Sequence, residues 1–184
     1  MNQLNELYLM SYFSQGINVV GNAQSLYSET KYGELIDRKK TIRFNWPHWD
    51  SKYTGTRQDV ICTNRYEWID NGSYDFLICQ TRPSNSLPYT KSFYQYPKDL
   101  LKKLKTKLNS KPSNGIRILY LLNYLSIKNV NIFGFDWKNT SSTTIEYTLT
   151  KNPSFKDNTH NYKKEKKICL DLIDKNNWTL MGEK

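Results

Sequence analysis

The stretch KPSNGIRILYLLNYLSIKNVNIFGFD, residues 111–136, decides the fold that this sequence predicts. Pro112 and Ser113 are typical of a helix start. The residues up to about Leu125 are apolar almost all round the helix, so we expect this helix to be buried. A β-branched and aromatic run then begins at Val130 and ends in Gly134-Phe135-Asp136, which predicts a buried strand. A buried helix followed by a buried strand indicates an α/β protein.

Similar patterns extend to both sides of this stretch. Short apolar runs bounded by turn residues predict further strands, at residues 17–21, 41–45, 59–64, 74–80 and 178–181. Helices are predicted from Pro97 to about Asn109 and from His160 to about Asp174, the latter capped by Asn158-Thr159. The alternation of strands and helices predicts a single Rossmann-like domain over residues 1–184, with a mostly parallel twisted sheet flanked by helices.

Composition limits the class of protein. The chain has 184 residues, 27 Lys plus Arg against 17 Asp plus Glu, and a net charge of +10. No apolar run reaches the ~20 residues of a membrane span, and the first 15 residues do not have the pattern of a secretory signal. Three separated cysteines without a CxxC pair are typical of reduced thiols. We therefore expect a cytoplasmic protein without stable membrane insertion.

The positive charge is concentrated in two clusters, and such clusters favour a polyanionic partner such as nucleic acid. One lies in residues 98–111 and the other in residues 151–167. The candidate nucleic-acid contacts are Lys102, Lys103, Lys105, Lys107, Lys163 and Lys164. Solvated helix faces, or the Lys-rich coding of an AT-rich genome, explain the same clusters without a partner.

Several features that suit a nucleotide follow predicted strands. Gly21-Asn22 follows the first apolar strand and Asn45 the second, and Gly134-Phe135-Asp136 ends the strand that begins at Val130. In open α/β sheets, ligands bind at the carboxyl ends of strands near a topological switch point. Ser113-Asn114-Gly115 lies at a helix amino end, where backbone amides favour a phosphate. The dinucleotide GxGxxG and the GxxxxGK[ST] P-loop are both absent from the sequence.

These stretches resemble the motifs of sialyltransferases, both the animal-type family and the small bacterial enzymes. Val19-Val20-Gly21-Asn22 through Leu26, then Arg43-Phe44-Asn45, is similar to the large motif. Pro112-Ser113-Asn114-Gly115, then Val130 through Gly134-Phe135-Asp136, is similar to the small motif. His160 and Glu165 match the H-x4-E spacing of the very-small motif, and all three motifs occur in the family's order.

The resemblance implies a sialyltransferase-like fold, a GT-A-type variant without DxD, and an inverting, metal-independent glycosyltransferase. It implies no cofactor, and a nucleotide-sugar donor for which a CMP-sugar is favoured and a UDP-sugar is the alternative. By the family pattern, Asn22 and Asn45 are expected to contact the nucleotide, and residues 134–136 to line the base or ribose. The sequence contains no D-x-D and only two histidines, which disfavours a usual zinc cluster.

His160 is the candidate general base that accepts the proton of the acceptor hydroxyl. The positive end of the following helix disfavours imidazolium and keeps the ring neutral. A surface histidine beside a helix cap is the structural alternative. Glu165, five positions further on, need not share the face of His160; pairing with neighbouring lysines is one alternative, and the sequence assigns it no firm role. For His48 a packed or surface residue is favoured over one that stacks on or binds a substrate.

Two departures from the family bear on the sugar. The large and small motifs contain no cysteine for the animal-type disulfide, and the family's additional histidine motif between the small and very-small motifs is absent. Tyr147, in the Ser/Thr-rich loop of residues 139–153, is a candidate for supplying a hydroxyl to the phosphate instead. These departures put sialic acid as the sugar in doubt.

The acceptor remains open between two classes. The lysines and the short chain favour hydroxymethylated cytosine in DNA, modified in the host cytoplasm by a phage enzyme that transfers a sugar such as arabinose. A bacterial surface glycan is the rival acceptor. A non-catalytic nucleic-acid-binding domain and another Rossmann-like nucleotide enzyme are the hypotheses outside this class.

Overall fold

The computed structural model describes residues 2–27, 30–45, 49–64, 74–81, 92–137 and 160–182. Their strands are β1 (Asn2–Gln3), β2 (Ile17–Val20), β3 (Thr41–Phe44), β4 (Val60–Cys62), β5 (Phe76–Cys79), β6 (Ser92–Gln95), β7 (Val130–Phe133) and β8 (Thr179–Met181). Their helices are α1 (Glu6–Tyr12), the short 3-10 helix η1 (Gln24–Tyr27), α2 (Gly33–Asp37), α3 (Lys98–Leu108), α4 (Asn114–Tyr124) and α6 (Tyr162–Asn176).

Within the described residues the strands form one open sheet in the order β1-β6-β5-β4-β3-β2-β7-β8. Every neighbouring pair is parallel. The strand order reverses at β2, which pairs with β3 on one side and with β7 on the other. Val20 aligns with Arg43 of β3 and Phe133 of β7, so these three strands end at the same level.

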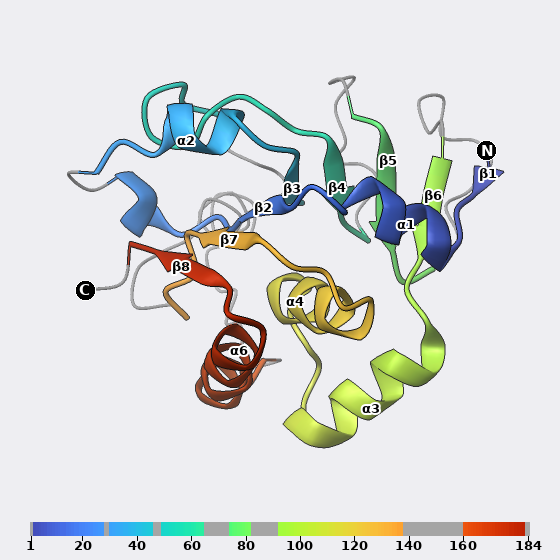
Figure 1. The fold of residues 1–184 in the computed structure, drawn as a ribbon. Coiled ribbons are helices and arrows are strands. Elements are labelled where there is room, and N and C mark those ends of the chain that lie inside the picture. The colour runs from blue at the N-terminus through green and yellow to red at the C-terminus, as the bar shows by residue number, and fades with distance from the viewer. Residues whose placement is uncertain are drawn as a thin grey trace, which may run out of the picture.

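Helices cover both faces of this sheet. Figure 1 shows α3, α4 and α6 on one face and α2 with η1 on the other. Strands β2 to β5 are buried at every position because both of their faces are covered. The side chains of α4 from Ile116 to Leu119 are all buried, as are Leu121 and Leu122, which confirms that this helix lies in the core.

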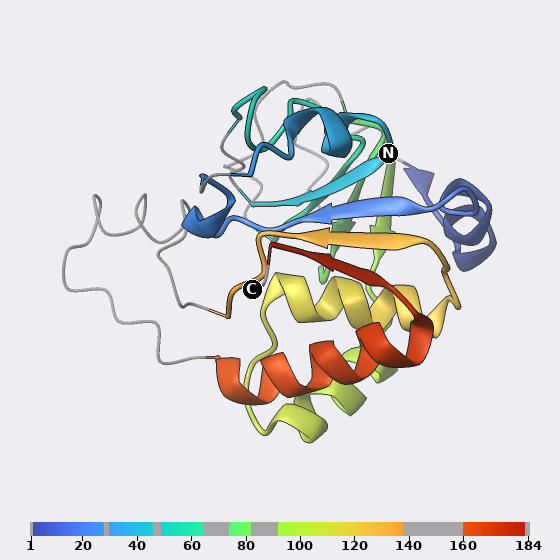
Figure 2. The same ribbon diagram turned by 60° about the vertical axis from the view of Figure 1, so that its left-hand side comes forward.

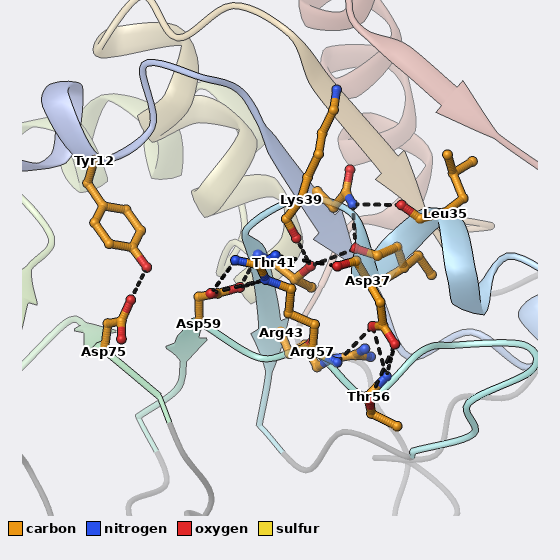
Figure 3. Close-up of polar contacts among 12 residues, drawn as sticks. Tyr12, Leu35, Asp37, Lys39, Thr41, Arg43, Thr56, Arg57, Asp59 and Asp75 are labelled. Atoms are coloured by element: carbon orange, nitrogen blue, oxygen red, sulfur yellow. Dashed lines mark hydrogen bonds and ion pairs between the residues drawn. The ribbon is translucent and has the colours of Figure 1, made fainter.

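The amino ends of β3 and β4 are held together by charged side chains (Figure 3). The Asp37 carboxylate accepts from the backbone N–H groups of Thr56 and Arg57, at 2.9 and 2.8 Å. Asp59 accepts from the N–H of Thr41 at 2.7 Å and from the Arg57 guanidinium. Carboxylates that accept several backbone hydrogen bonds order a loop at little cost, and here they fix the segment before β4.

The predicted fold class is confirmed, and the sheet is parallel throughout its described strands. The strands predicted from residue 17, 41, 59, 74, 130 and 178 all exist, shorter by one to three residues. The prediction missed α1, α2, β1 and β6, because each is too short for a periodic pattern. The last helix was predicted to begin at His160; it begins at Tyr162, and Asn161 caps it by accepting from the Lys164 N–H. Asn158-Thr159 and the loop at 139–153 lie outside the described residues.

Candidate active site

Residues from three neighbouring strands meet where the strand order reverses. Gly21 and Asn22 follow β2, Asn45 follows β3, and Gly134 follows β7. Figure 2 shows the amino ends of α4 and α6 on the same side of the molecule as the carboxyl ends of β2 and β7. This is the switch point at which parallel α/β proteins bind ligands. Here the tertiary structure brings together residues as distant in sequence as Gly21 and His160.

Glycines let the backbones and one aromatic ring approach closely at this point. A Cβ at Gly21 would overlap the carbonyl oxygen of Gly134, whose own φ of +65° suits glycine. A Cβ at Gly115 would lie 2.7 Å from Cε1 of Phe135. The Phe135 ring also packs edge-on against Phe44, with 6.0 Å between ring centroids. The Phe135 ring is thus packed between Phe44 of β3 and Gly115 of α4. Asp136 beside it is partly exposed.

Asparagine side chains join the strand ends through hydrogen bonds. Asn22 donates from Nδ2 to the carbonyl of Phe44 at 3.0 Å. The Oδ1 of Asn45 accepts from Nδ2 of Asn114 at 2.8 Å and from the Thr63 hydroxyl at 3.2 Å. Asn45 has a φ of 50°, a conformation that asparagine tolerates better than most residues. This network ties the start of α4 to β3 and β4.

Ser113 caps α4 and binds a buried carboxylate. Its side chain accepts from the N–H of Ile116. Its own N–H donates to Oε1 of Glu165 at 2.8 Å, and its hydroxyl donates to Oε2 at 2.6 Å. Glu165 is only 3% exposed, and these two bonds give it a position that the sequence did not assign. Glu165 lies in the first turn of α6 and faces Ser113 at the start of α4, a direction that its spacing from His160 in the sequence does not reveal.

His160 lies just before the N-cap of α6, against the turn that precedes α4. Its Nδ1 is 2.7 Å from the carbonyl oxygen of Lys111 and 3.9 Å from Oε1 of Glu165. Because a carbonyl only accepts, Nδ1 carries the proton in this contact. In the neutral ring Nε2 then has the lone pair, which is the tautomer that a general base requires.

The lysine clusters lie on helix surfaces. Exposed residues include Lys102, Lys103, Lys105 and Lys107 on α3, and Lys163 and Lys164 in the first turn of α6. The two on α6 follow His160 by three and four positions, whereas those on α3 belong to a helix that contributes no side chain to the contacts above. Tyr147 and His48 lie outside the described residues.

The sequence interpretation missed Asn64, Gln80 and Arg117. The backbone N–H of Gln80 donates to Oδ1 of Asn64 at 2.8 Å, where β4 and β5 end. Arg117, in α4, is 4% exposed, and its Nε donates to the Ser113 carbonyl at 3.3 Å. Burial lowers the Arg117 pKa. One signal was present in the sequence, because an amide residue stands at or just after the end of every strand from β2 to β6.

Across residues 2–27, 30–45, 49–64, 74–81, 92–137 and 160–182, no three His, Cys, Asp or Glu side chains group in a way that could hold a metal ion. No helix within those ranges combines the length and apolar character needed to cross a membrane. The polar side chains named at the site are amides, hydroxyls, the His160 imidazole, the buried Glu165 and Arg117, and the partly exposed Asp136.

Fold and site together define a parallel α/β protein with its polar residues at a switch point. No protein-family model and no curated protein matches the sequence. A mammalian sialyltransferase in complex with Gal-beta-1-3GalNAc-ortho-nitrophenol matches at TM-score 0.61 and 14% identity, over 97% of this chain and 79% of that chain. The sialyltransferase CstII from Campylobacter jejuni, in complex with the substrate analogue CMP-3FNeuAc, matches at TM-score 0.57 and 17% identity, over 89% and 79%. The chain has the sialyltransferase fold, as the motif resemblance implied.

Proposed function

We propose that this protein is an inverting glycosyltransferase that transfers a sugar from a nucleotide-sugar, with a CMP-sugar favoured, to a hydroxyl acceptor. The main support for this proposal is the position of the His160 ring. Its Nδ1 contacts the carbonyl oxygen of Lys111 at 2.7 Å, beside the amino end of α4. The similar structures add support, since the sialyltransferase CstII was solved in complex with CMP and a trisaccharide acceptor.

The reaction is a direct displacement at the anomeric carbon. The acceptor oxygen forms the new bond to that carbon, the bond to the phosphate oxygen of the donor breaks, and the nucleotide leaves as CMP. Nε2 of His160 takes the proton of the acceptor hydroxyl. The first-turn amides of α4, at Asn114 and Gly115, have no partner inside the helix and suit the leaving phosphate. We infer that no metal ion is needed for this step.

Nucleotide binding is tested by thermal unfolding with CMP, UMP, GMP, AMP and the CMP, UDP and GDP sugars. A ligand at ~100 times its dissociation constant stabilises a fold by ~2.7 kcal/mol. We expect a shift with cytidine nucleotides that Ser113→Trp abolishes. Ser14→Trp is the matched control, because Ser14 lies after α1, away from the site, and its hydroxyl donates to the carbonyl of Ser11. A shift with uridine nucleotides alone would exclude the CMP donor, and no shift with any nucleotide would favour a non-catalytic domain.

For the acceptor we propose hydroxymethylated cytosine in DNA, on one observation: exposed lysines continue from His160 along α6. Phosphate contacts make binding depend on salt. We expect Lys163→Glu with Lys164→Glu to weaken DNA binding and transfer about tenfold or more at low salt. Lys128→Glu is the control, an exposed lysine before the amino end of β7. Transfer to a glycan that ignores these charges would favour the surface-glycan acceptor, and DNA binding without donor turnover would favour the non-catalytic hypothesis.

A further inference from the structure

Arg117 is a buried cation beneath the candidate site, and its charge needs compensation. It is the fourth residue of α4 and 4% exposed. Burying a cation costs free energy unless neighbouring groups bind it. Burial lowers the Arg117 pKa, and Cys62, Tyr96, Glu165 and Cys79 act in the opposite direction. Arginine nevertheless keeps its charge in proteins, so these neighbours have to accommodate a full positive charge.

Glu165 is the carboxylate in that group of neighbours. Burial raises the pKa of the Cys62 thiol to about 12, and burial also raises the pKa of the Tyr96 hydroxyl, so both are neutral near pH 7. Glu165 is itself 3% exposed, and a buried carboxylate is stable only when it is paired and hydrogen-bonded. Ser113 supplies two hydrogen bonds to it, and Arg117 binds the carbonyl of the same Ser113.

The other side of Arg117 reaches the ends of β4 and β5. With its amide oriented to satisfy its neighbours, Gln80 accepts through its side-chain oxygen from the Arg117 guanidinium and from Nδ2 of Asn64 at 3.1 Å. Nε of Arg117 meanwhile donates to the carbonyl of Ser113. One guanidinium therefore connects Ser113, the N-cap residue of α4, to Gln80 at the carboxyl end of β5.

We propose that Arg117 is a positioning residue for the reaction: it binds the carbonyl of Ser113, whose N–H and hydroxyl hold Glu165 beside His160, and its guanidinium fixes Gln80 at the end of β5. This inference rests on the proposed function. The Glu165 carboxylate, 3.9 Å from Nδ1 of His160, stabilises the imidazolium that forms when Nε2 takes the acceptor proton. Lys111 supplies the carbonyl on the same nitrogen, and Tyr162 packs against the ring.

A double-mutant cycle on kcat tests the coupling, with Arg117→Gln, Glu165→Gln and the double variant. We expect each single change to lower kcat by about 10²-fold, with KM for the donor and Kd for CMP within about twofold of the parent. The double variant is expected to lie within about threefold of the worse single variant, because Arg117 acts through Ser113 on the same Glu165 carboxylate. Losses that multiply, or a kcat that Arg117→Gln leaves unchanged, would overturn the proposal.

Two further variants separate charge from packing. Arg117→Lys keeps the charge and is expected to retain kcat within about tenfold, whereas equal losses in Arg117→Lys and Arg117→Gln would indicate a packing role and overturn the proposal. Arg43→Gln is the matched control, because Arg43 is also buried but donates to the carbonyls of Arg57 and Thr54. Its effect on kcat is expected to multiply with that of Glu165→Gln. An inactive parent protein would instead refute the proposed function itself.

Discussion

The two ends of the parallel sheet use polar residues in different ways. At the amino ends of β3 and β4, carboxylates bind backbone N–H groups and an arginine, so each charge is matched inside the fold (Figure 3). At the carboxyl ends, amide side chains connect β2 to β5, the buried Arg117 and Glu165 lie on the helices beside them, and the amino ends of two helices point to the same place. The charged network at the amino ends holds a loop in place. The carboxyl ends combine amide and hydroxyl groups with one imidazole and these two buried charged residues, a set that suits a nucleotide and a sugar.

The largest expected difference between the two ends is in catalysis. His160→Ala removes the base and should lower kcat by about 10²–10⁴-fold. CMP binding should persist, because the glycines and asparagines of the nucleotide site are unchanged. The measurements are initial rates of donor turnover and thermal shifts with CMP. A variant that keeps the parent's rate would show that another group accepts the proton.

Gly21→Ala should affect both stability and binding. The added Cβ meets the backbone carbonyl of Gly134, which has no flexible side chain to move away. Overpacking of this kind costs about 1–3 kcal/mol of unfolding free energy, and displacement of Gly134 should also weaken CMP binding. Urea unfolding and CMP titration measure the two effects. The control is Ala23→Gly, a small residue two positions later; unchanged unfolding in Gly21→Ala would contradict the packing seen here.

Asp37→Ala tests the opposite end of the sheet. The change removes the acceptor of the Thr56 and Arg57 N–H groups, and leaving such groups unpaired costs about 1–3 kcal/mol. We expect this loss in urea unfolding while kcat stays within about twofold, because the carboxylate lies at the amino ends of the strands. A large drop in kcat at unchanged stability would contradict the division between the two ends.

The smallest effect concerns alkaline pH and Tyr12. Burial and the hydrogen bond to Asp75 raise the pKa of the Tyr12 hydroxyl above its ordinary value of 10. Above pH 10 the unfolded chain releases this proton while the folded protein retains it, so stability falls as pH rises. The urea midpoint of the parent should therefore drop more between pH 8 and pH 11 than that of Tyr12→Phe. Equal drops would show that Tyr12 does not contribute.

Elements with a clear local sequence pattern were predicted, whereas short elements without one were missed. The helix at α4 and the strand at β7 were predicted from sequence because Ser113 caps the one and mostly apolar residues ending at a glycine form the other. The two residues of β1 and the four of β6 have no such signal, since their pairing comes from neighbours distant in sequence. His160 was singled out through its motif, whereas no motif pointed to Arg117.

The sequence by itself determined the α/β class, most of the strands and the residue types that follow them, because hydrophobic periodicity and turn residues are local properties. Only the tertiary structure decided that Glu165 is buried against Ser113 and close to His160. It also decided that Arg117 lies buried between them and β5. Charge compensation of this kind depends on which helices pack together, and that information is spread over the whole chain.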